Sequence, residues 1–290
     1  MLIHGTVTVD QIDHIIVWNE STTEAVKKLY AKYDTQPPEF NYSPFKGKYT
    51  LHFTKFMVRG QDNQSLVTGP ILLKERFKKT IKSIVKKRSL LPQETKFLFK
   101  DISDALAKLN DDFTLIKELD GIYELETKND VHSENVSDHT LNVVANLEGL
   151  AYYKSLKKPD QNILKLSAYL HDIGKGPKSK WKDGKQPSYP DHPADAPEML
   201  ERILVEDFKK LSDYEIRKIC LLVTYHDLIG EIIGKGRDIK QLIDIVEDEM
   251  ELEMLDTLNV ADVQAIDKFM WMINYQGSIK GIKDKVKENF

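Results

Sequence analysis

Cysteine is almost absent from this sequence of 290 residues, which contains only Cys220. One cysteine cannot form a disulfide within the chain, and it cannot supply the several thiolates of a cysteine-based zinc site. Cys220 lies in an apolar run, so we expect a buried, unreactive thiol. A metal site in this protein would therefore use histidine and carboxylate ligands.

Long apolar runs are also missing, since none approaches the roughly 20 residues of a membrane-spanning helix. The first residues lack the basic start and apolar core of a signal peptide. Hydrophobic residues make up 41% of the chain and charged residues 30%, a composition typical of a folded globular protein rather than a disordered one. We therefore expect a cytoplasmic protein without a membrane partner, and a homo-oligomer is compatible with this composition.

Charge is distributed unevenly, although the formal net charge is only -4. Residues 1–130 contain 20 Lys and Arg against 18 Asp and Glu, whereas residues 131–290 contain 22 against 28. The excess of carboxylates thus lies in the second part of the chain, which also contains the candidate site considered below.

The pattern of apolar residues changes near residue 130. Before it, the sequence predicts strands over 2–9, 14–18 and 49–53, a helix over 22–33, and a β-hairpin whose turn is Asp120-Gly121. Residues 126–136 are polar and aperiodic, as in a linker, and almost everything after them has helical spacing. We predict an α+β domain over residues 1–130, followed by an all-α helical bundle over residues 131–290.

A basic amphipathic helix is predicted over residues 74–88. One face is apolar, and the other carries eight cationic side chains against Glu75 alone: Lys74, Arg76, Lys78, Lys79, Lys82, Lys86, Lys87 and Arg88. Such a face suits contact with a nucleic-acid backbone. The sequence favours an ordinary solvated surface instead, because lysine-rich surface helices are common and no aromatic residues are interleaved for base stacking. Both interpretations stay open.

Histidines and carboxylates recur at the ends of the helices predicted in the second part. His139 begins one helix, the pair His171-Asp172 ends another, His192 precedes a third and His226 ends a fourth. Gly174 follows the pair, where a glycine free to take positive φ commonly ends a helix. Any one of these histidines is explained equally well by the helix dipole, but the full set is harder to explain in that way.

Asp262 is the last member of the set, and it lies among apolar neighbours inside a long predicted helix over 250–274. A buried carboxylate without a partner is costly, and a metal ion is one way to satisfy it. An adjacent imidazole and carboxylate at a helix end, as in His171-Asp172, can both reach one ion.

The order of these residues resembles the HD-domain superfamily of metal-dependent phosphohydrolases. The family pattern is a first His, then His-Asp, then a distant Asp, and here His139, His171-Asp172 and Asp262 match it. The resemblance covers about residues 137–270 and implies an HD-type helical bundle. His192 and His226 match the places of two further histidines that support a second metal in many members.

The resemblance implies one or two divalent ions, drawn from Mn, Fe, Ni, Co, Zn and Mg. His139, His171, Asp172 and Asp262 would hold one ion, and Asp172 would bridge to a second held by His192 and His226. A metal-activated hydroxide would then attack phosphorus. Asp172 and Lys175 are the predicted catalytic residues, and Lys175 and Lys178 are predicted to bind the phosphorylated substrate.

Two functions follow from this pattern. The first is a phosphohydrolase or phosphodiesterase acting on a nucleotide or on an RNA-end phosphate. The alternative is a non-catalytic regulatory or nucleic-acid-binding protein that uses its metal as a sensor or structural element. A complete ligand set favours the enzyme, whereas nucleic-acid binding through residues 74–88 would favour the alternative.

Overall fold

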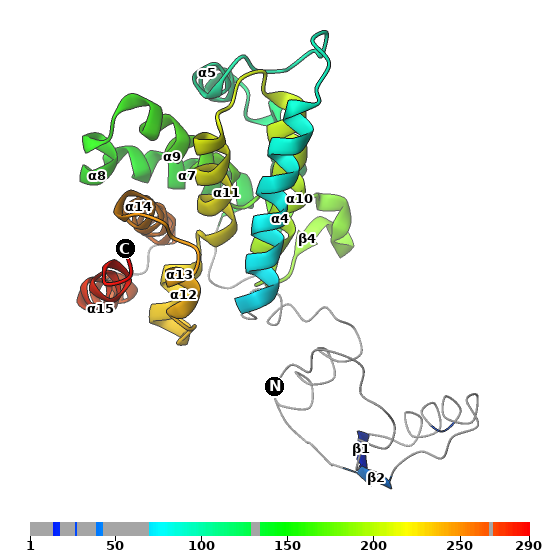
Figure 1. Ribbon diagram of the computed structural model, residues 1–290, viewed down its shortest axis with the longest axis vertical. Helices are drawn as coiled ribbons and strands as arrows, with labels where there is room; N and C mark the ends of the chain where they lie inside the picture. The colour runs from blue at the N-terminus through cyan, green and yellow to red at the C-terminus, as the bar shows by residue number, and fades with distance from the viewer. Residues whose placement is uncertain (1–13, 18–26, 28–38, 43–69, 129–133, 267–268) are drawn as a thin grey trace. The chain divides into compact units, whose positions relative to one another are not determined.

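The computed structural model describes residues 14–17, 27, 39–42, 70–128, 134–266 and 269–290 (Figure 1). The chain divides into two compact units, residues 1–62 and residues 63–290. This division lies well before residue 130, where the sequence pattern had placed the boundary.

In the first unit the structure describes two short strands. Strand β1 (His14–Val17) pairs in parallel with β2 (Glu39–Tyr42), in the register His14 with Glu39 to Val17 with Tyr42. The strand predicted over 14–18 is thereby confirmed in its first four residues. The predictions over 2–9 and 49–53, and nearly all of 22–33, lie outside the described residues. Two strands do not support an α+β domain extending to residue 130.

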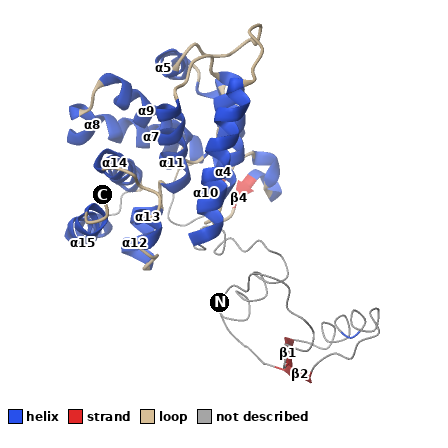
Figure 2. Ribbon diagram, viewed as in Figure 1, coloured by secondary structure: helices blue, strands red, loops and turns tan. Residues whose placement is uncertain are grey.

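The second unit is mostly helical, as Figure 2 shows. Its longer helices are α4 (Pro70–Ser89), α5 (Ile102–Asp111), α7 (Val136–Gly149), α9 (Lys158–Leu170), α10 (His192–Arg202), α11 (Asp213–Tyr225), α12 (Leu228–Lys235), α14 (Glu249–Ala265) and α15 (Phe269–Lys287). Shorter elements are η3 (Phe113–Leu115), α6 (Lys117–Ile122), α8 (Ala151–Ser155), η4 (Ile173–Lys175), η5 (Lys178–Lys180), η6 (Lys182–Gly184), the π-helical turn η7 (Ile203–Asp207) and α13 (Lys240–Ile243). The strands β3 (Glu126–Thr127) and β4 (Lys185–Gln186) form a parallel pair.

Side-chain caps start several of these helices where the sequence places a short polar residue. Asn135 accepts a hydrogen bond from the backbone N–H of Asp138 at the start of α7, and Asp248 does the same for α14. Helix α11 begins with a complete capping box between Ser212 and Glu215. These bonds satisfy backbone donors that a helix start leaves unpaired.

The core of the second unit is formed by α7, α9, α11 and α14. Helix α7 packs against α9 and α14, while α11 packs against α9, α10 and α14. Leu147, Leu164, Leu222 and Leu258 are fully buried on these helices. The apolar spacing in the sequence thus produces a bundle whose helix ends converge on one region.

Helices α4, α5 and α6 belong to this same unit, although they precede residue 130. Helix α4 packs against α10 and α11, and α5 packs against α9. The guanidinium of Arg202 in α10 donates to Glu118 in α6, with 2.6 Å between Nε and Oε1. The hairpin predicted at Asp120-Gly121 is wrong, because these two residues lie inside α6.

Two further helix predictions need adjustment. The long helix predicted over 250–274 is two helices, α14 and α15, since α14 ends at Ala265. The helix predicted over 74–88 is confirmed and begins earlier, at Pro70. Among the described residues, none of the helices has the length and apolar character that a membrane crossing requires.

Candidate metal centre

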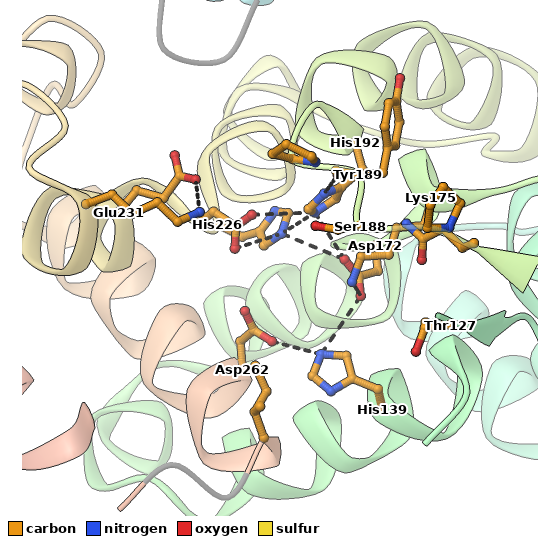
Figure 3. A pocket seen from close by; sticks show the side chains of 16 residues that line it. Thr127, His139, Asp172, Lys175, Ser188, Tyr189, His192, His226, Glu231 and Asp262 are labelled. Carbon is orange, nitrogen blue, oxygen red and sulfur yellow. Dashed lines mark hydrogen bonds and ion pairs between the residues drawn. The ribbon is translucent and has the colours of Figure 1, made fainter. Parts of the chain in front are cut away.

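Six side chains positioned by five helices converge in the second unit, and Figure 3 shows all of them except His171. His139 lies in the first turn of α7, and His171-Asp172 directly follows α9. His192 begins α10, His226 follows α11, and Asp262 lies in the last turn of α14. All six are at most 7% exposed, so the site is desolvated. The structure therefore brings together all six residues that the sequence predicts as metal ligands.

Three of the imidazoles are held in one orientation by the backbone. The Nδ1 atoms of His171, His192 and His226 lie 2.7–2.9 Å from the carbonyl oxygens of Ala168, Tyr189 and Val223, each three residues earlier. A carbonyl can only accept, so each Nδ1 carries the proton and donates. Each Nε2 is therefore unprotonated in the neutral ring, as a metal ligand must be.

Asp172 lies at the centre of the set. Its Oδ1 atom is 3.2 Å from His192 Nε2 and 3.9 Å from His226 Nε2. Its Oδ2 atom is 3.4 Å from His171 Nε2 and 3.9 Å from His139 Nε2. One carboxylate thus faces two pairs of imidazoles, one pair with each oxygen, which is the arrangement of a bridging ligand.

Asp262 faces His139, with 2.8 Å between Oδ1 and Nε2. The same oxygen lies 3.9 Å from His171 Nε2. Ligand atoms of His139, His171 and Asp262 all lie within 4.8 Å of one another, and so do those of Asp172, His192 and His226. These are two groups, each able to hold one ion.

Buried polar atoms at the site lack hydrogen-bond partners among the described residues. They include His171 Nε2 and Asp172 Oδ1, both fully shielded from solvent. Such atoms are costly unless something binds them. The nitrogen and oxygen donors fit a divalent ion such as Mn, Fe, Co, Ni or Zn, and the carboxylates extend the choice to Mg.

The pKa values in the site reflect competition between burial and charge. Burial alone would raise the pKa of Asp172, but Lys175 and His171 outweigh it and hold the pKa well below its ordinary value. Burial would lower the pKa of His139, yet the hydrogen bond and charge of Asp262 raise it. The carboxylates are therefore ionised near neutral pH, as metal ligation requires.

Comparison with known protein families agrees with this geometry. Residues 136–272 match the family model described as HD domain. The chain carries an HD domain. No curated protein and no solved structure matches it. HD domains bind divalent metals, and their superfamily generally comprises metal-dependent hydrolases.

A pocket of about 190 Å³ opens onto the centre of this HD domain. Besides the histidines and carboxylates at its floor, residues from outside the HD pattern line it, among them Thr127, Gln186, Ser188, Tyr189, Glu231 and Lys235. Figure 3 shows His139, Asp172, His192, His226 and Asp262 facing this space. His171 is completely buried and is not among the lining residues.

The two predicted substrate lysines occupy different places. Lys175 lines the pocket, and its Nζ atom lies 2.5 Å from Asp172 Oδ2. Burial would lower the pKa of Lys175, but Asp172 raises it, so the amine stays charged. Lys178 is half-buried in η5 and is not among the residues that line the pocket. Its role in binding substrate stays a prediction.

The reason for a glycine at position 174 differs from the prediction, which was a positive φ at the end of a helix. Its φ is not among the positive values found in the described residues. A Cβ atom on Gly174 would instead lie 1.9 Å from the backbone oxygen of His192. Glycine is needed here because η4 and the start of α10 approach closely.

Four further residues line the pocket but are not among the ligands and lysines predicted from the sequence: Asp227, Gln186, Tyr189 and Glu231. Asp227 lies 3.5 Å from His226 Nε2 and 3.6 Å from His192 Nε2, and it directly follows His226 in sequence. That adjacency, a second His-Asp pair, was a usable signal. Gln186, Tyr189 and Glu231 carry no comparable signal, because only folding brings them to the pocket.

Proposed function

We propose that this protein is a metal-dependent phosphohydrolase or phosphodiesterase that acts on a nucleotide or on an RNA-end phosphate. The observation that supports it best is the orientation of three imidazoles around one buried carboxylate. Each of His171, His192 and His226 has its Nδ1 bound to a carbonyl and its Nε2 near Asp172. Histidines that only stabilise helix ends have no need to direct their Nε2 atoms at one buried carboxylate.

Each of the two groups of ligand atoms would form one metal site. His139, His171 and Asp262 would hold one ion, and His192 and His226 would hold the second, with Asp172 between them. Divalent ions in such a site supply Lewis acidity and a water of lowered pKa for attack on phosphorus. The pocket above the ligands is where the phosphoryl group would lie.

Lys175 would bind the phosphate from within the protein. One of its three N–H donors is directed to Asp172 Oδ2, which leaves two for phosphate oxygens. Because the amine is charged and largely buried, its attraction for the developing negative charge is stronger than that of a surface lysine. Asp172 in turn holds Lys175 at the floor of the pocket.

The test combines metal analysis with hydrolysis of bis-p-nitrophenyl phosphate and of a nucleotide panel in Mn, Co, Ni and Mg. Asp172→Asn replaces the central carboxylate, and Asp213→Asn makes the same chemical change at the exposed start of α11. We expect bound metal and turnover in the wild type and in Asp213→Asn. Asp172→Asn should lose about 100-fold or more in turnover.

Other outcomes separate the alternatives. Metal binding without hydrolysis of any phosphate would favour the regulatory protein over the enzyme. Absence of bound metal in the wild type, after refolding with each ion, would contradict both.

A further inference from the structure

The strand pair β3–β4 forms one wall of the pocket. Glu126 pairs with Lys185 and Thr127 with Gln186 in parallel register. Successive side chains of a strand point to opposite faces. Glu126 and Lys185 accordingly form an exposed ion pair, whereas Thr127 and Gln186 line the pocket. The backbone N–H of Lys128 also donates to the carbonyl of Gln186 at 2.7 Å, which strengthens this wall.

Gln186 is only 3% exposed. It lines the pocket, and no hydrogen bond joins its carboxamide to any side chain or backbone group that the structure describes. A buried carboxamide has a strong need for partners, because it offers two donors on nitrogen and two acceptor sites on oxygen. The open side of this carboxamide is the pocket itself, so a bound molecule is what would satisfy it.

The two lysines on the pocket wall are each paired with a carboxylate. Lys175 is directed to Asp172, and Lys235 pairs with Glu231 at 2.9 Å between Nζ and Oε1. Glu231 is also held by Arg237, with 2.7 Å between Oε2 and Nη1. Besides Gln186, the pocket lining includes neutral polar groups, the hydroxyls of Thr127 and Ser188, and the ring of Tyr189.

We propose that Gln186 determines substrate specificity by binding a neutral edge of the organic group that carries the phosphate. This inference rests on the proposed function and names its substrate class. The substrate is a small phosphomonoester whose organic group presents a donor and an acceptor side by side, as a nucleobase or an amide does. At about 190 Å³ the pocket is smaller than those of most drug-sized ligands, so it takes one such unit at a time.

The experiment compares phosphomonoesters that differ in this edge. The four nucleoside 5′-monophosphates AMP, CMP, GMP and UMP would be tested beside ribose 5-phosphate, which lacks a base. N-acetylglucosamine 6-phosphate would be tested beside glucose 6-phosphate, which lacks the amide. The two arms distinguish a nucleobase from an amide, and p-nitrophenyl phosphate serves as a substrate without such an edge.

Gln186→Met keeps the approximate size of the side chain and removes the donor and acceptor groups of the carboxamide. We expect about a tenfold or greater loss in kcat/KM for the preferred base-bearing or amide-bearing substrate. Turnover of p-nitrophenyl phosphate, and of ribose 5-phosphate or glucose 6-phosphate as the matched substrate, should change less than about twofold. Lys185→Met, on the opposite face of the same strand, should leave the ranking of substrates unchanged.

An equal loss on every substrate, or no loss on any, would overturn the proposal. If the metal-loaded wild type hydrolyses nothing, including p-nitrophenyl phosphate, the proposed function fails, and dissociation constants from calorimetry then decide about Gln186. If Gln186→Met binds only the base-bearing or amide-bearing ligands more weakly than the wild type, the role of Gln186 is supported. Equal dissociation constants in the two proteins contradict it.

Discussion

Gly174 lies where the backbone of η4 meets the start of α10. The oxygen of His192 and the nitrogen of Ala196 would lie 1.9 and 3.3 Å from a Cβ atom at this position. Both are backbone atoms, so no side-chain rotation can relieve the clash. This close approach keeps Asp172 beside His192.

We predict that Gly174→Ala destabilises the protein by about 1–3 kcal/mol, because the added methyl group forces two backbone segments apart. It should also weaken metal binding, since His192 would move from Asp172. Gly149→Ala is the control, because a Cβ atom there meets nothing within 4 Å. Denaturant unfolding of both variants measures the difference, and equal stabilities would contradict the prediction.

His139 provides a pH-dependent contribution to stability in the metal-free protein. Burial would lower the pKa of His139, but the hydrogen bond and the charge of Asp262 raise it by more. The folded pKa therefore lies above the ordinary value of 6.5. A raised pKa means that folding favours the protonated ring. The contribution is therefore complete below about pH 6.5 and is lost as the pH rises through the folded pKa.

We expect the difference in unfolding free energy between the wild type and His139→Gln, measured in EDTA, to be larger at pH 5.5 than at pH 9. With metal present the trend should reverse, because the ion requires an unprotonated ring. A difference that stays constant with pH in EDTA would show that the ion pair with Asp262 does not form.

The candidate ligands could be predicted from the sequence because the histidines and Asp172 stand at or near predicted helix ends, Asp262 lies among apolar neighbours, and all follow a fixed order. His139, His171-Asp172 and Asp262 are in this category, and the structure brings them together. Gln186 and Glu231 could not be predicted. Their placement depends on the strand pair β3–β4 and on the ion pair of Glu231 with Arg237, which no local pattern encodes.

The cationic side chains of helix α4 fall into two groups, those bonded to neighbouring helices and those exposed to solvent. Arg76 donates to the carbonyl of Ala194, and Lys87 forms an ion pair with Glu201. Lys78, Lys79, Lys82 and Lys86 are exposed. Much of the charge therefore attaches α4 to the HD domain, and only the remaining lysines are presented to solvent. Binding of nucleic acid through α4 stays a prediction.

Arg88 is the strongest of these attachments. Its Nη1 donates to the carbonyls of Leu204 and Phe208 at 2.5 and 2.8 Å, and its Nη2 donates to Lys209 at 3.1 Å. These carbonyls lie around the end of η7, where helical carbonyls lack partners of their own.

We predict that Arg88→Ala lowers the unfolding free energy by about 2 kcal/mol, because charge-assisted bonds to several carbonyls are lost together. Lys82→Ala, which removes an exposed lysine of the same helix, should change it by less than about 0.5 kcal/mol. Chemical denaturation of the two variants measures both values. Similar losses would mean that α4 is not held by Arg88.

The region before residue 130 illustrates the limit of local patterns. Asp120-Gly121 is a strong hairpin signal, yet α6 forms there because Leu119 and Ile122 are fully buried against the rest of the unit. Tertiary packing overrides turn propensity at this point. The same packing explains why α4 and α5 belong with the HD domain rather than with residues 1–62.

A metal ion bound where the helices converge would make metal binding and folding of the second unit interdependent. The candidate ligands come from α7, α10 and α14 and from the residues that follow α9 and α11, so an ion would connect helices far apart in sequence. A ligand that binds only the folded state adds about 2.7 kcal/mol when its free concentration is 100 times the dissociation constant.

We therefore expect the thermal midpoint to fall when EDTA removes metal from the wild type, and to recover when the ion is restored. The midpoint of Asp172→Asn should respond far less, because its central ligand is impaired. Differential scanning calorimetry measures both responses. An equal shift in the two proteins would place the stabilising ion elsewhere.

Trp181 gives the pocket a built-in optical probe. Its indole Nε1 donates to the carbonyl of Lys175 at 2.7 Å, and its ring lies 5.1 Å from that of Tyr189 between centroids. Of the three tryptophans, it is the one whose side chain the structure describes. An ion or phosphate ester that shifts Lys175 or Tyr189 changes the surroundings of this indole. Intrinsic fluorescence can therefore follow occupancy of the pocket in solution, without a label and without turnover.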